Sequence, residues 1–461
     1  MSEGIRTGAL RGVGGWTVRS AWSTFCRTVV RVFYRRCEVH GLEHVPPRGP
    51  VLFCANHPSA IIDAVVLQAA LPRNLHPLAR SGLFRNPLLL PVLKLIQAVP
   101  VYRRQDTGSD TSRNRDMFRR CHELLGRGGA LLIFPEGESH MDPAMRAMKT
   151  GAARMALDAI TAEAPSLTLL PVGLTFSDVG RFRNSVLVQV GAPTPVGQAP
   201  EESKDQAVQR LTGEIEGALR QLTLNLASWQ EHALLRRLER FFALRHGKYR
   251  RRSLNQRFRA LQKLGDALTR LRARDPEALE RTERRLQQFE GLCRRFGVRD
   301  YQLTITNTPA TVARFVVRSL VILLVLLPVG IWGLINSIVP YGLTGVLAER
   351  MAHDRYQYDT AKVALGMGFF SLFWGAQTAL VQSWWGWPAA LGYLASLPPA
   401  AGLALFVQHE RRRIAENIRT FFRFLRHRRL REVLGAKRQQ LERDLARLAR
   451  LAKRRLEEPP G

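Results

Sequence analysis

Cysteine is scarce in this chain of 461 residues. The five cysteines are scattered, and no CxxC pair or His/Cys cluster occurs among them. Such spacing supplies neither the framework of a disulfide-stabilised secreted domain nor the ligand set of a zinc site. We therefore expect reduced thiols in a cytosol-facing protein. The cysteines are Cys26, Cys37, Cys54, Cys121 and Cys293.

Acidic residues are also few. The chain has 38 Asp and Glu against 69 Lys and Arg, a formal net charge of +31. This excess implies a polyanionic partner, either nucleic acid or an anionic membrane surface. The arginine clusters lack an aromatic stacking platform or a recognisable nucleic-acid-binding fold, so we expect a membrane and no nucleic acid. The N-terminal region has arginines but no uninterrupted apolar core, which argues against a cleaved signal peptide.

Long apolar runs are confined to the C-terminal half. Residues 319–340 hold no charge and are long enough to span a bilayer, and two further apolar blocks follow at 364–383 and 387–407. The WWGW stretch between the last two suits a turn at headgroup level. Arginines flank both ends of the region, so three full crossings would violate the positive-inside rule. We favour a spanning hairpin over residues 364–407 and a re-entrant, rather than spanning, block over 314–345. The re-entrant block would be broken at Pro328, Gly330, Gly333 and Asn336.

The stretch VLFCANHPSAIIDAV, residues 51–65, carries the first sign of chemistry. It predicts a buried strand followed by a helix, with His57 at the corner between them. Pro58 suits the first helical turn and keeps His57 extended. Asp63 lies about a turn and a half into the helix, within reach of one ring nitrogen of His57. The other nitrogen would then be a general base. A chance His and Asp at short spacing is the alternative.

Residues 51–195 alternate apolar strands with helices, which predicts an α/β domain with a mostly parallel sheet. A second strand ends in FPEG, at residues 134–137. Strand ends of a parallel sheet share one edge, so we expect His57 and Glu136 to meet there. Glu136 can accept hydrogen bonds from hydroxyl groups, and Gly137 permits close backbone approach. Cations suited to a phosphate are present in Arg103, Arg104 and Lys149.

Four motifs in order, between about residues 40 and 225, resemble those of the glycerolipid acyltransferases. NHP with Asp63 resembles the first motif and FPEG the third, which implies His57 and Asp63 as catalytic residues and Asn56, Glu136 and Gly137 as substrate-binding residues. VPVYRR, at residues 99–104, resembles the motif whose arginine holds the acceptor phosphate. LPVG, at 170–173, resembles the motif tied to the acyl-donor site, here through Pro171 and Gly173.

The resemblance implies a membrane-bound O-acyltransferase. It would move a fatty acyl group from acyl-CoA or acyl carrier protein, as co-substrate, to glycerol-3-phosphate or 1-acylglycerol-3-phosphate. It needs no cofactor, no metal and no serine or cysteine nucleophile. The alternatives that remain open are dihydroxyacetone phosphate or another lysophospholipid as acceptor, and, less favoured, a non-enzymatic basic membrane scaffold.

Two departures from the common family pattern indicate which branch of the family this chain resembles. Five residues, not the commonest four, separate His57 from Asp63, and Glu-Ser-His follows FPEG where Thr-Arg-Ser is common. Both traits resemble the branch that includes fungal glycerol-3-phosphate/dihydroxyacetone-phosphate acyltransferases. Because the arginine of that triplet is absent, the acceptor phosphate must be held by Arg80, Arg103, Arg104 or Lys149.

The expected architecture is an α/β acyltransferase domain followed by an Arg-rich helical region, C-terminal membrane helices and a basic tail. The basic amphipathic helix near the N-terminus suits a membrane interface, and packing on the domain is an equal alternative. We expect the inner (cytoplasmic) membrane, anionic phospholipids as partners, and a catalytic domain facing the cytoplasm. The expected parts are an N-terminal membrane-associating helix (1–39), the acyltransferase domain (40–200), the Arg-rich helices (201–310), the membrane region (311–408) and the basic cytoplasmic tail (409–461).

Overall fold

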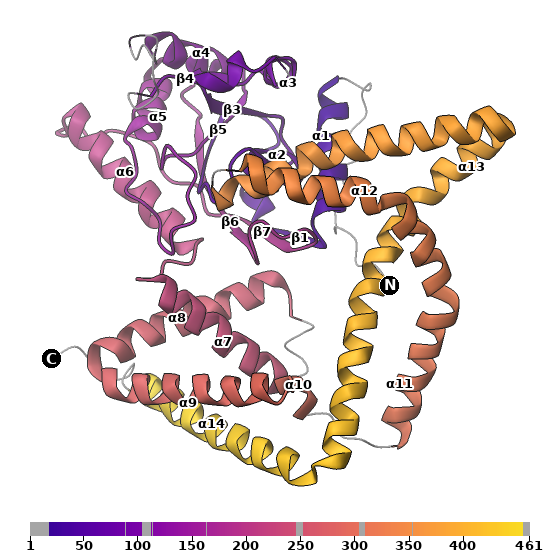
Figure 1. Ribbon diagram of the computed structural model, residues 1–461. Helices are drawn as coiled ribbons and strands as arrows, with labels where there is room; N and C mark the ends of the chain where they lie inside the picture. The colour runs from indigo at the N-terminus through magenta and orange to yellow at the C-terminus, as the bar shows by residue number, and fades with distance from the viewer. Residues whose placement is uncertain are drawn as a thin grey trace. The chain divides into compact units, whose positions relative to one another are not determined.

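The computed structural model describes residues 18–87, 89–103, 112, 114–162, 164–245, 252–303, 309–352 and 354–454. The chain divides into two compact units (Figure 1). The first comprises residues 1–229, 253–255 and 349–363, and the second comprises 230–252, 256–348 and 364–461. A short piece from the C-terminal half of the chain, 349–363, therefore belongs to the N-terminal unit.

The first unit is built on a seven-stranded sheet with the order β1-β7-β6-β2-β5-β3-β4. Strands β6, β2, β5, β3 and β4 run parallel, whereas β7 is antiparallel to β6 and β1 is parallel to β7. The mostly parallel α/β sheet is therefore confirmed. The strands are β1 (Arg36–His40), β2 (Val51–Ala55), β3 (Leu75–Arg80), β4 (Val99–Val101), β5 (Ala130–Ile133), β6 (Thr168–Phe176) and β7 (Ser185–Val190).

Helices cover both faces of this sheet. Side chains of β2 alternate between the faces, as expected for a strand: Phe53 lies in the hydrophobic core beneath α1 and α2, and Leu52 lies in the core beneath α4, α5 and α6. Both faces being covered explains why β2 is apolar at every position. The helices of this unit are α1 (Val18–Phe33), α2 (Ile61–Ala70), α3 (Leu90–Leu95), α4 (Asn114–Gly126), α5 (Gly151–Ala162) and α6 (Lys204–Gln221).

The N-terminal helix α1 packs on the domain. Cys26, Val30 and Phe33 are buried, and the last two belong to the core that α2 shares, while Phe25 and Val32 stay exposed. The packing alternative thus holds for one face of α1. Strand β1 begins at residue 36, so the sheet takes in residues that we had placed before the domain.

The second unit is helical. Helices α9 and α14 pack together, and Arg285 on α9 pairs with Asp444 on α14 at 2.5 Å. Buried Leu434, Leu441 and Leu445 form the apolar stripe of α14. The elements are α7 (Trp229–Arg245), α8 (Leu254–Arg274), α9 (Pro276–Arg295), α10 (Asp300–Leu303), α11 (Pro309–Val321), a π-helical turn (Ile322–Leu326), α12 (Leu327–Met351), α13 (Tyr358–Arg426) and α14 (Arg428–Arg454).

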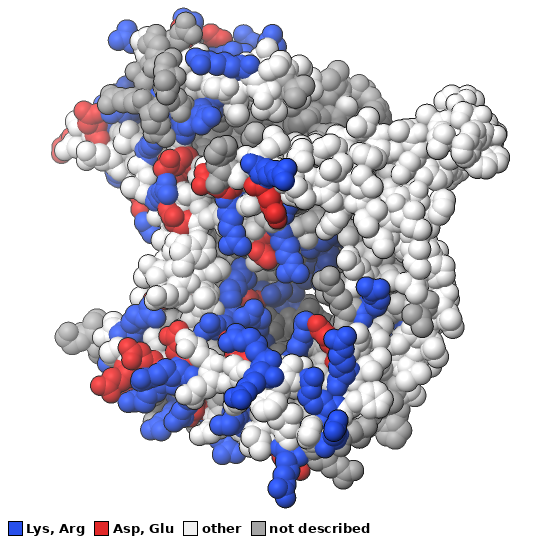
Figure 2. Space-filling model, viewed as in Figure 1, with Lys and Arg blue, Asp and Glu red and all other residues white. Residues whose placement is uncertain are grey.

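Two helices, Ala313–Met351 and Arg355–Gln408, are long and apolar enough to cross a membrane by length and composition. The first continues through its Pro and Gly positions, so the break that we predicted at Pro328, Gly330, Gly333 and Asn336 is wrong. The second turns back at Gly386 (φ 76°, ψ 178°), inside the WWGW stretch. Figure 2 shows α12 and the adjoining part of α13 as a surface almost without charge.

Candidate active site

Four parallel strands of the first unit end at the same edge of the sheet. His57 follows β2, Glu136 follows β5, Arg80 ends β3 and Arg103 follows β4. The register between β2 and β5 pairs Cys54 with Ile133, so His57 and Glu136 leave the sheet side by side. The expectation that these two residues meet is correct, because the His57 backbone N–H donates to Glu136 Oε1 at 3.2 Å.

His57 and Asp63 form a hydrogen-bonded pair. The distance from His57 Nδ1 to Asp63 Oδ2 is 2.9 Å, and the same oxygen accepts the Ser59 backbone N–H at 2.7 Å. The Asp63 side chain is fully buried, whereas that of His57 keeps 17% of its surface exposed. Burial raises the pKa of the Asp63 carboxyl, and the hydrogen bond from His57 opposes that rise. With its proton on Nδ1, the imidazole has a free lone pair on Nε2.

The imidazole of His57 is also fixed by stacking. Its ring lies 3.9 Å from the ring of Phe134, with an angle of 13° between the planes. Phe134 precedes Glu136 in the FPEG motif, so this motif holds His57 twice, through its backbone and through its ring. Together with Asp63, these contacts leave the imidazole little rotational freedom.

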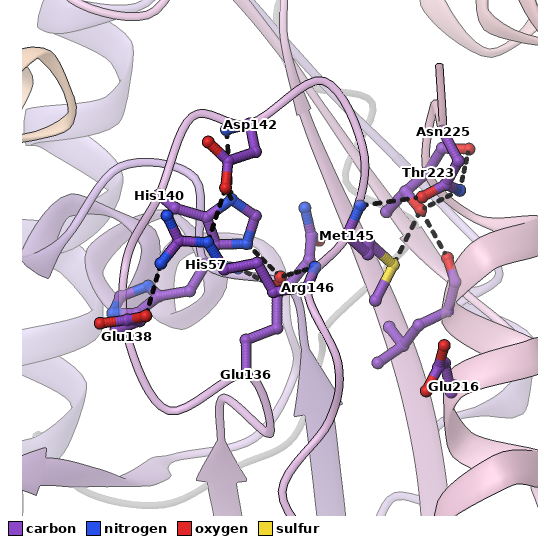
Figure 3. A network of polar contacts seen from close by, with 12 residues as sticks. His57, Glu136, Glu138, His140, Asp142, Met145, Arg146, Glu216, Thr223 and Asn225 are labelled. Atoms are coloured by element: carbon purple, nitrogen blue, oxygen red, sulfur yellow. Dashed lines mark hydrogen bonds and ion pairs between the residues drawn. The ribbon is translucent and has the colours of Figure 1, made fainter. Parts of the chain in front are cut away.

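The loop after β5 folds back over Glu136 (Figure 3). Glu136 is almost completely buried, and its Oε2 accepts the His140 Nε2–H and the Arg146 backbone N–H. His140 Nδ1 accepts the Asp142 backbone N–H, which leaves the proton on Nε2 of a neutral ring. The His140 backbone N–H donates to the His57 carbonyl at 3.2 Å. The loop thus ties the two motif-bearing strand ends together.

Arg146 closes this loop through its side chain. Its guanidinium pairs with Glu138 and, at 2.6 Å, with Asp142. Residues 144–150 precede α5, which begins only at Gly151. They do not extend that helix because their backbone N–H groups bond to neighbours in the fold, such as Glu136. Sequence reasoning assigned no role to His140 or Arg146. The spacing of four residues between Glu136 and His140 is the one signal that could have suggested their contact.

Two of the predicted phosphate ligands converge on Gly137. Arg103 Nη1 donates to the Gly137 carbonyl at 2.9 Å. A Cβ on Gly137, whose φ is +78°, would lie 2.7 Å from Lys149 Nζ, so the ammonium rests directly on this glycine. Arg80 is exposed and lies near Gly82, at the end of its strand. Arg104 lies outside the described residues.

Asn56 and the fourth motif hold the sheet together. The Asn56 side chain bonds to both backbone groups of Leu174 on β6, at 2.6 Å and 3.0 Å. Pro171 and Gly173 are buried within β6, and a Cβ on Gly173 would lie 2.3 Å from the Leu222 carbonyl oxygen. The structure brings Asn56 next to the fourth motif, and their roles toward substrate and acyl donor stay predictions.

No cluster of three His, Cys, Asp or Glu side chains suited to a metal ion occurs among the described residues. The polar groups at the corner instead form hydrogen bonds with one another, among them those of His57 with Asp63 and of His140 with Glu136. The arrangement offers a buried acid, an oriented imidazole with a free nitrogen, and two cations near by. Such a set can take a proton from a hydroxyl group next to a bound anion.

Comparison with known proteins places this site in a family. Residues 36–175 match the family model described as Acyltransferase. The chain carries an acyltransferase domain. This stretch contains the whole His57 corner, the FPEG motif and Arg103, and it ends within β6.

Relatives of the acyltransferase domain act on glycerol phosphates, according to their names. A chloroplastic 1-acyl-sn-glycerol-3-phosphate acyltransferase of Arabidopsis thaliana is 30% identical over 142 residues, which are 31% of this chain and 37% of that protein. Glycerol-3-phosphate O-acyltransferase 2 of Saccharomyces cerevisiae is 28% identical over 28% of this chain and 18% of its own length. The chain thus matches well under two thirds of these relatives.

A solved structure is also similar. It is the 1-acyl-sn-glycerophosphate acyltransferase of Thermotoga maritima, at 18% identity, with a TM-score of 0.34 over 44% of this chain and 79% of that chain. The resemblance inferred from the four motifs is confirmed by the family model and the sequence relatives.

Proposed function

We propose that this protein transfers a fatty acyl group from a thioester donor to a hydroxyl of glycerol-3-phosphate or 1-acylglycerol-3-phosphate. The observation that carries the proposal is the His57–Asp63 pair, 2.9 Å apart, at the strand edge that also presents Glu136 and Arg103. The acceptors are those named for the relatives of the domain. The donor is acyl-CoA or acyl carrier protein, used as co-substrate.

In the proposed reaction, His57 is the general base. Its Nε2 takes the proton from the acceptor hydroxyl, while Asp63 keeps the imidazole in the right tautomer and stabilises its positive charge. The hydroxyl oxygen attacks the thioester carbonyl and forms the ester bond. The carbon–sulfur bond then breaks, and the thiolate leaves and takes the proton from the imidazolium. The step consumes no metal, oxidant or reductant.

Arg103 and Lys149 are the proposed grip for the acceptor phosphate. Both meet at Gly137, one residue from the Glu136 carboxylate that holds the His57 backbone. A guanidinium can bind a phosphate through two parallel hydrogen bonds. The backbone N–H groups of Gly137 and Leu174 bond to the Phe134 carbonyl and to Asn56 Oδ1.

The proposed location is the inner membrane, with the catalytic domain in the cytoplasm. Support comes from the two long apolar helices and from the net charge of +31, which suits the anionic lipids of the cytoplasmic leaflet. An apolar acyl product would enter the bilayer directly. Anionic phospholipids are the expected lipid partners.

One assay tests the function. Membranes containing the full chain are incubated with labelled acyl-CoA, or acyl carrier protein loaded with the label, and a panel of phosphorylated acceptors including dihydroxyacetone phosphate. We expect labelled acyl ester with at least one glycerol-phosphate acceptor. His57→Ala should lower turnover by about 10²- to 10⁴-fold.

His40→Ala is the matched control, because His40 lies on the edge strand β1 and pairs with Glu38 at 3.6 Å. The control should keep its turnover. Robust transfer by a well-folded His57→Ala variant would rule out the assigned base. No transfer to any acceptor by the wild-type chain would favour the membrane scaffold instead.

A further inference from the structure

The residues of the strand-to-helix corner at His57 do not by themselves stabilise its backbone. Ala60, the residue before α2, has φ +53° and ψ −137°, a backbone conformation that is unfavourable for a residue with a Cβ. Ala60 also gives α2 no side-chain cap. The first N–H groups of a helix need acceptors from outside the helix. The corner that carries the catalytic pair therefore depends on help from elsewhere.

That help comes from residues 349–363, almost 300 residues further along the chain. Thr360 Oγ1 accepts the Ile62 backbone N–H at 3.2 Å, which supplies the missing cap of α2. Asp359 Oδ2 accepts the Ser59 hydroxyl at 3.2 Å. Ser59, Asp63 and Asp359 are all fully buried, so these bonds are shielded from water.

The contacts lead to the imidazole in two steps. Ser59, which Asp359 holds by its hydroxyl, donates its backbone N–H to Asp63 Oδ2 at 2.7 Å. That same oxygen bonds His57 Nδ1 at 2.9 Å. Thr360 fixes the first turn of α2, on which Asp63 stands. Both residues thus act on the carboxylate that orients the base.

The segment is firmly anchored beside the corner. Lys362 Nζ donates to the Gly180 carbonyl at 2.6 Å, in the turn between β6 and β7. A Cβ on Gly180 would lie 3.4 Å from the Tyr358 Cβ, so the segment packs against this turn. Val363 packs against the core that α1 and α2 share. The segment is therefore an integral part of the catalytic unit.

We propose that Asp359 and Thr360, in the first turn of α13, position the His57–Asp63 pair by holding the corner between β2 and α2. This inference rests on the proposed acyl transfer. They are positioning residues, since neither contacts His57. Their loss should lower kcat while the acceptor KM stays nearly unchanged, because the phosphate grip at Gly137 lies on another loop.

Thr360 offers a matched pair of variants. Thr360→Val keeps the shape and removes the acceptor oxygen, whereas Thr360→Ser keeps the oxygen. We expect Thr360→Val and Asp359→Asn to lower kcat at least about tenfold, since small misplacements of a base are costly. Thr360→Ser should stay within about twofold of the wild type. So should Asp354→Asn, which changes an exposed acid of the same segment that makes no side-chain cap bond.

A second readout does not need turnover. The rate at which diethyl pyrocarbonate modifies His57, measured by peptide mass spectrometry across pH, reports the apparent pKa of the imidazole. We expect Thr360→Val to shift this pH profile and Thr360→Ser to leave it in place. If the wild-type chain transfers no acyl group, the proposed function fails while this profile still tests the positioning.

The proposal is overturned if Thr360→Val and Asp359→Asn keep the kcat and the His57 profile of the wild type. It is also overturned if these variants lose only thermal stability, with unchanged kcat per folded molecule, because that result indicates a purely structural contact. Equal losses in Thr360→Val and Thr360→Ser would overturn the capping role, since the hydroxyl would then not matter.

Discussion

Helices α2 and α12 are both rich in aliphatic residues, yet α2 buries these side chains and α12 exposes them. In α2 the aliphatic residues Ile62, Val66 and Leu67 are buried in the protein core. In α12 the buried positions are mostly small or polar, and the large aliphatic side chains face outward. The inward set of α12 is Gly330, Gly333, Asn336, Ser337, Pro340 and Ala348, and the outward set includes Val329, Ile331, Leu334, Ile335 and Ile338.

The side chain of Asn336 on α12 is satisfied inside the helix pair. Asn336 bonds the Trp332 carbonyl at 2.8 Å and accepts the Tyr393 hydroxyl at 2.6 Å. A Cβ on Gly333 would lie 2.0 Å from the Ala400 carbonyl oxygen, so α12 and α13 touch at their backbones. Small residues at the contact, hydrogen bonds inside and aliphatic residues outside are the pattern of helices that pack in lipid.

The composition of an aliphatic helix does not show whether protein or lipid covers its side chains. An aliphatic helix is stable in water when protein covers it, as α2 is covered, and otherwise needs an apolar solvent. The one acid of α2, Asp63, is buried because it serves His57. The equivalent buried polar residue of α12, Asn336, serves helix packing. Four predictions test this difference.

The largest effect expected is all-or-none. It concerns the side of the membrane on which the chain segments that flank α12 lie. Residues 253–255 and 349–363 both belong to the catalytic unit: the Leu254 N–H donates to Glu38, and Asp359 bonds Ser59. In a membrane, we therefore expect the chain between them to start and end on one side. In the described residues of that stretch, Ala313–Met351 is the only helix long and apolar enough to cross, so we expect it not to make a single full crossing.

We expect cysteines introduced by Asp354→Cys and Arg181→Cys to react from the same side of sealed vesicles with a maleimide that does not cross membranes. Arg181 lies in the catalytic domain, and both positions are exposed. Labelling of the two positions from opposite sides would contradict the assignment of residues 349–363 to the catalytic unit.

The second prediction removes the acid of α2. Asp63→Asn should lower kcat by about 10²- to 10⁴-fold, because the amide no longer fixes the imidazole tautomer. Asn336→Leu in α12 is the counterpart and should leave kcat unchanged while weakening the helix pair. Steady-state kinetics on both variants checks this. An unchanged turnover in Asp63→Asn would show that Asp63 does not contribute to catalysis.

The third prediction compares matched truncations. Leu67→Ala, at a fully buried position of α2, should lower the free energy of unfolding by about 2–5 kcal/mol. Ile335→Ala, at a position of α12 that is 65% exposed, should change it by about 0.5 kcal/mol or less. Denaturant titration in the same mild detergent measures both. Equal losses would mean that protein, not lipid, covers Ile335.

The sequence predicted those parts of the fold that depend on local pattern. Strand β2 was placed correctly because an apolar run covered on both faces ends at an Asn-His-Pro turn. Strand β1 was missed because RCEVH is a mixed, half-buried edge sequence. The His57–Asp63 pair followed from spacing, since both residues belong to one corner. Arg103 and Lys149 both lie at Gly137, and their role toward phosphate stays a prediction.

What the sequence did not show depends on contacts across long distances or within irregular loops. The bond from Thr360 to Ile62 joins positions 298 residues apart, and neither lies in a recognisable motif. The loop after FPEG looked helical because it is rich in Ala and Met, but its backbone bonds to Glu136. The break predicted in α12 failed because neighbouring helix α13 packs against the glycines and supports a continuous helix.

The smallest effect expected concerns the native thiols. Burial raises the pKa of Cys54, in β2, to about 12, and that of Cys121, on α4, to about 12 as well. At neutral pH these groups are almost entirely protonated and therefore unreactive. We expect N-ethylmaleimide to leave the transfer rate within about twofold of the untreated enzyme. Rapid inactivation, abolished in Cys54→Ala, would place a reactive thiol beside the corner and call the assigned base into question.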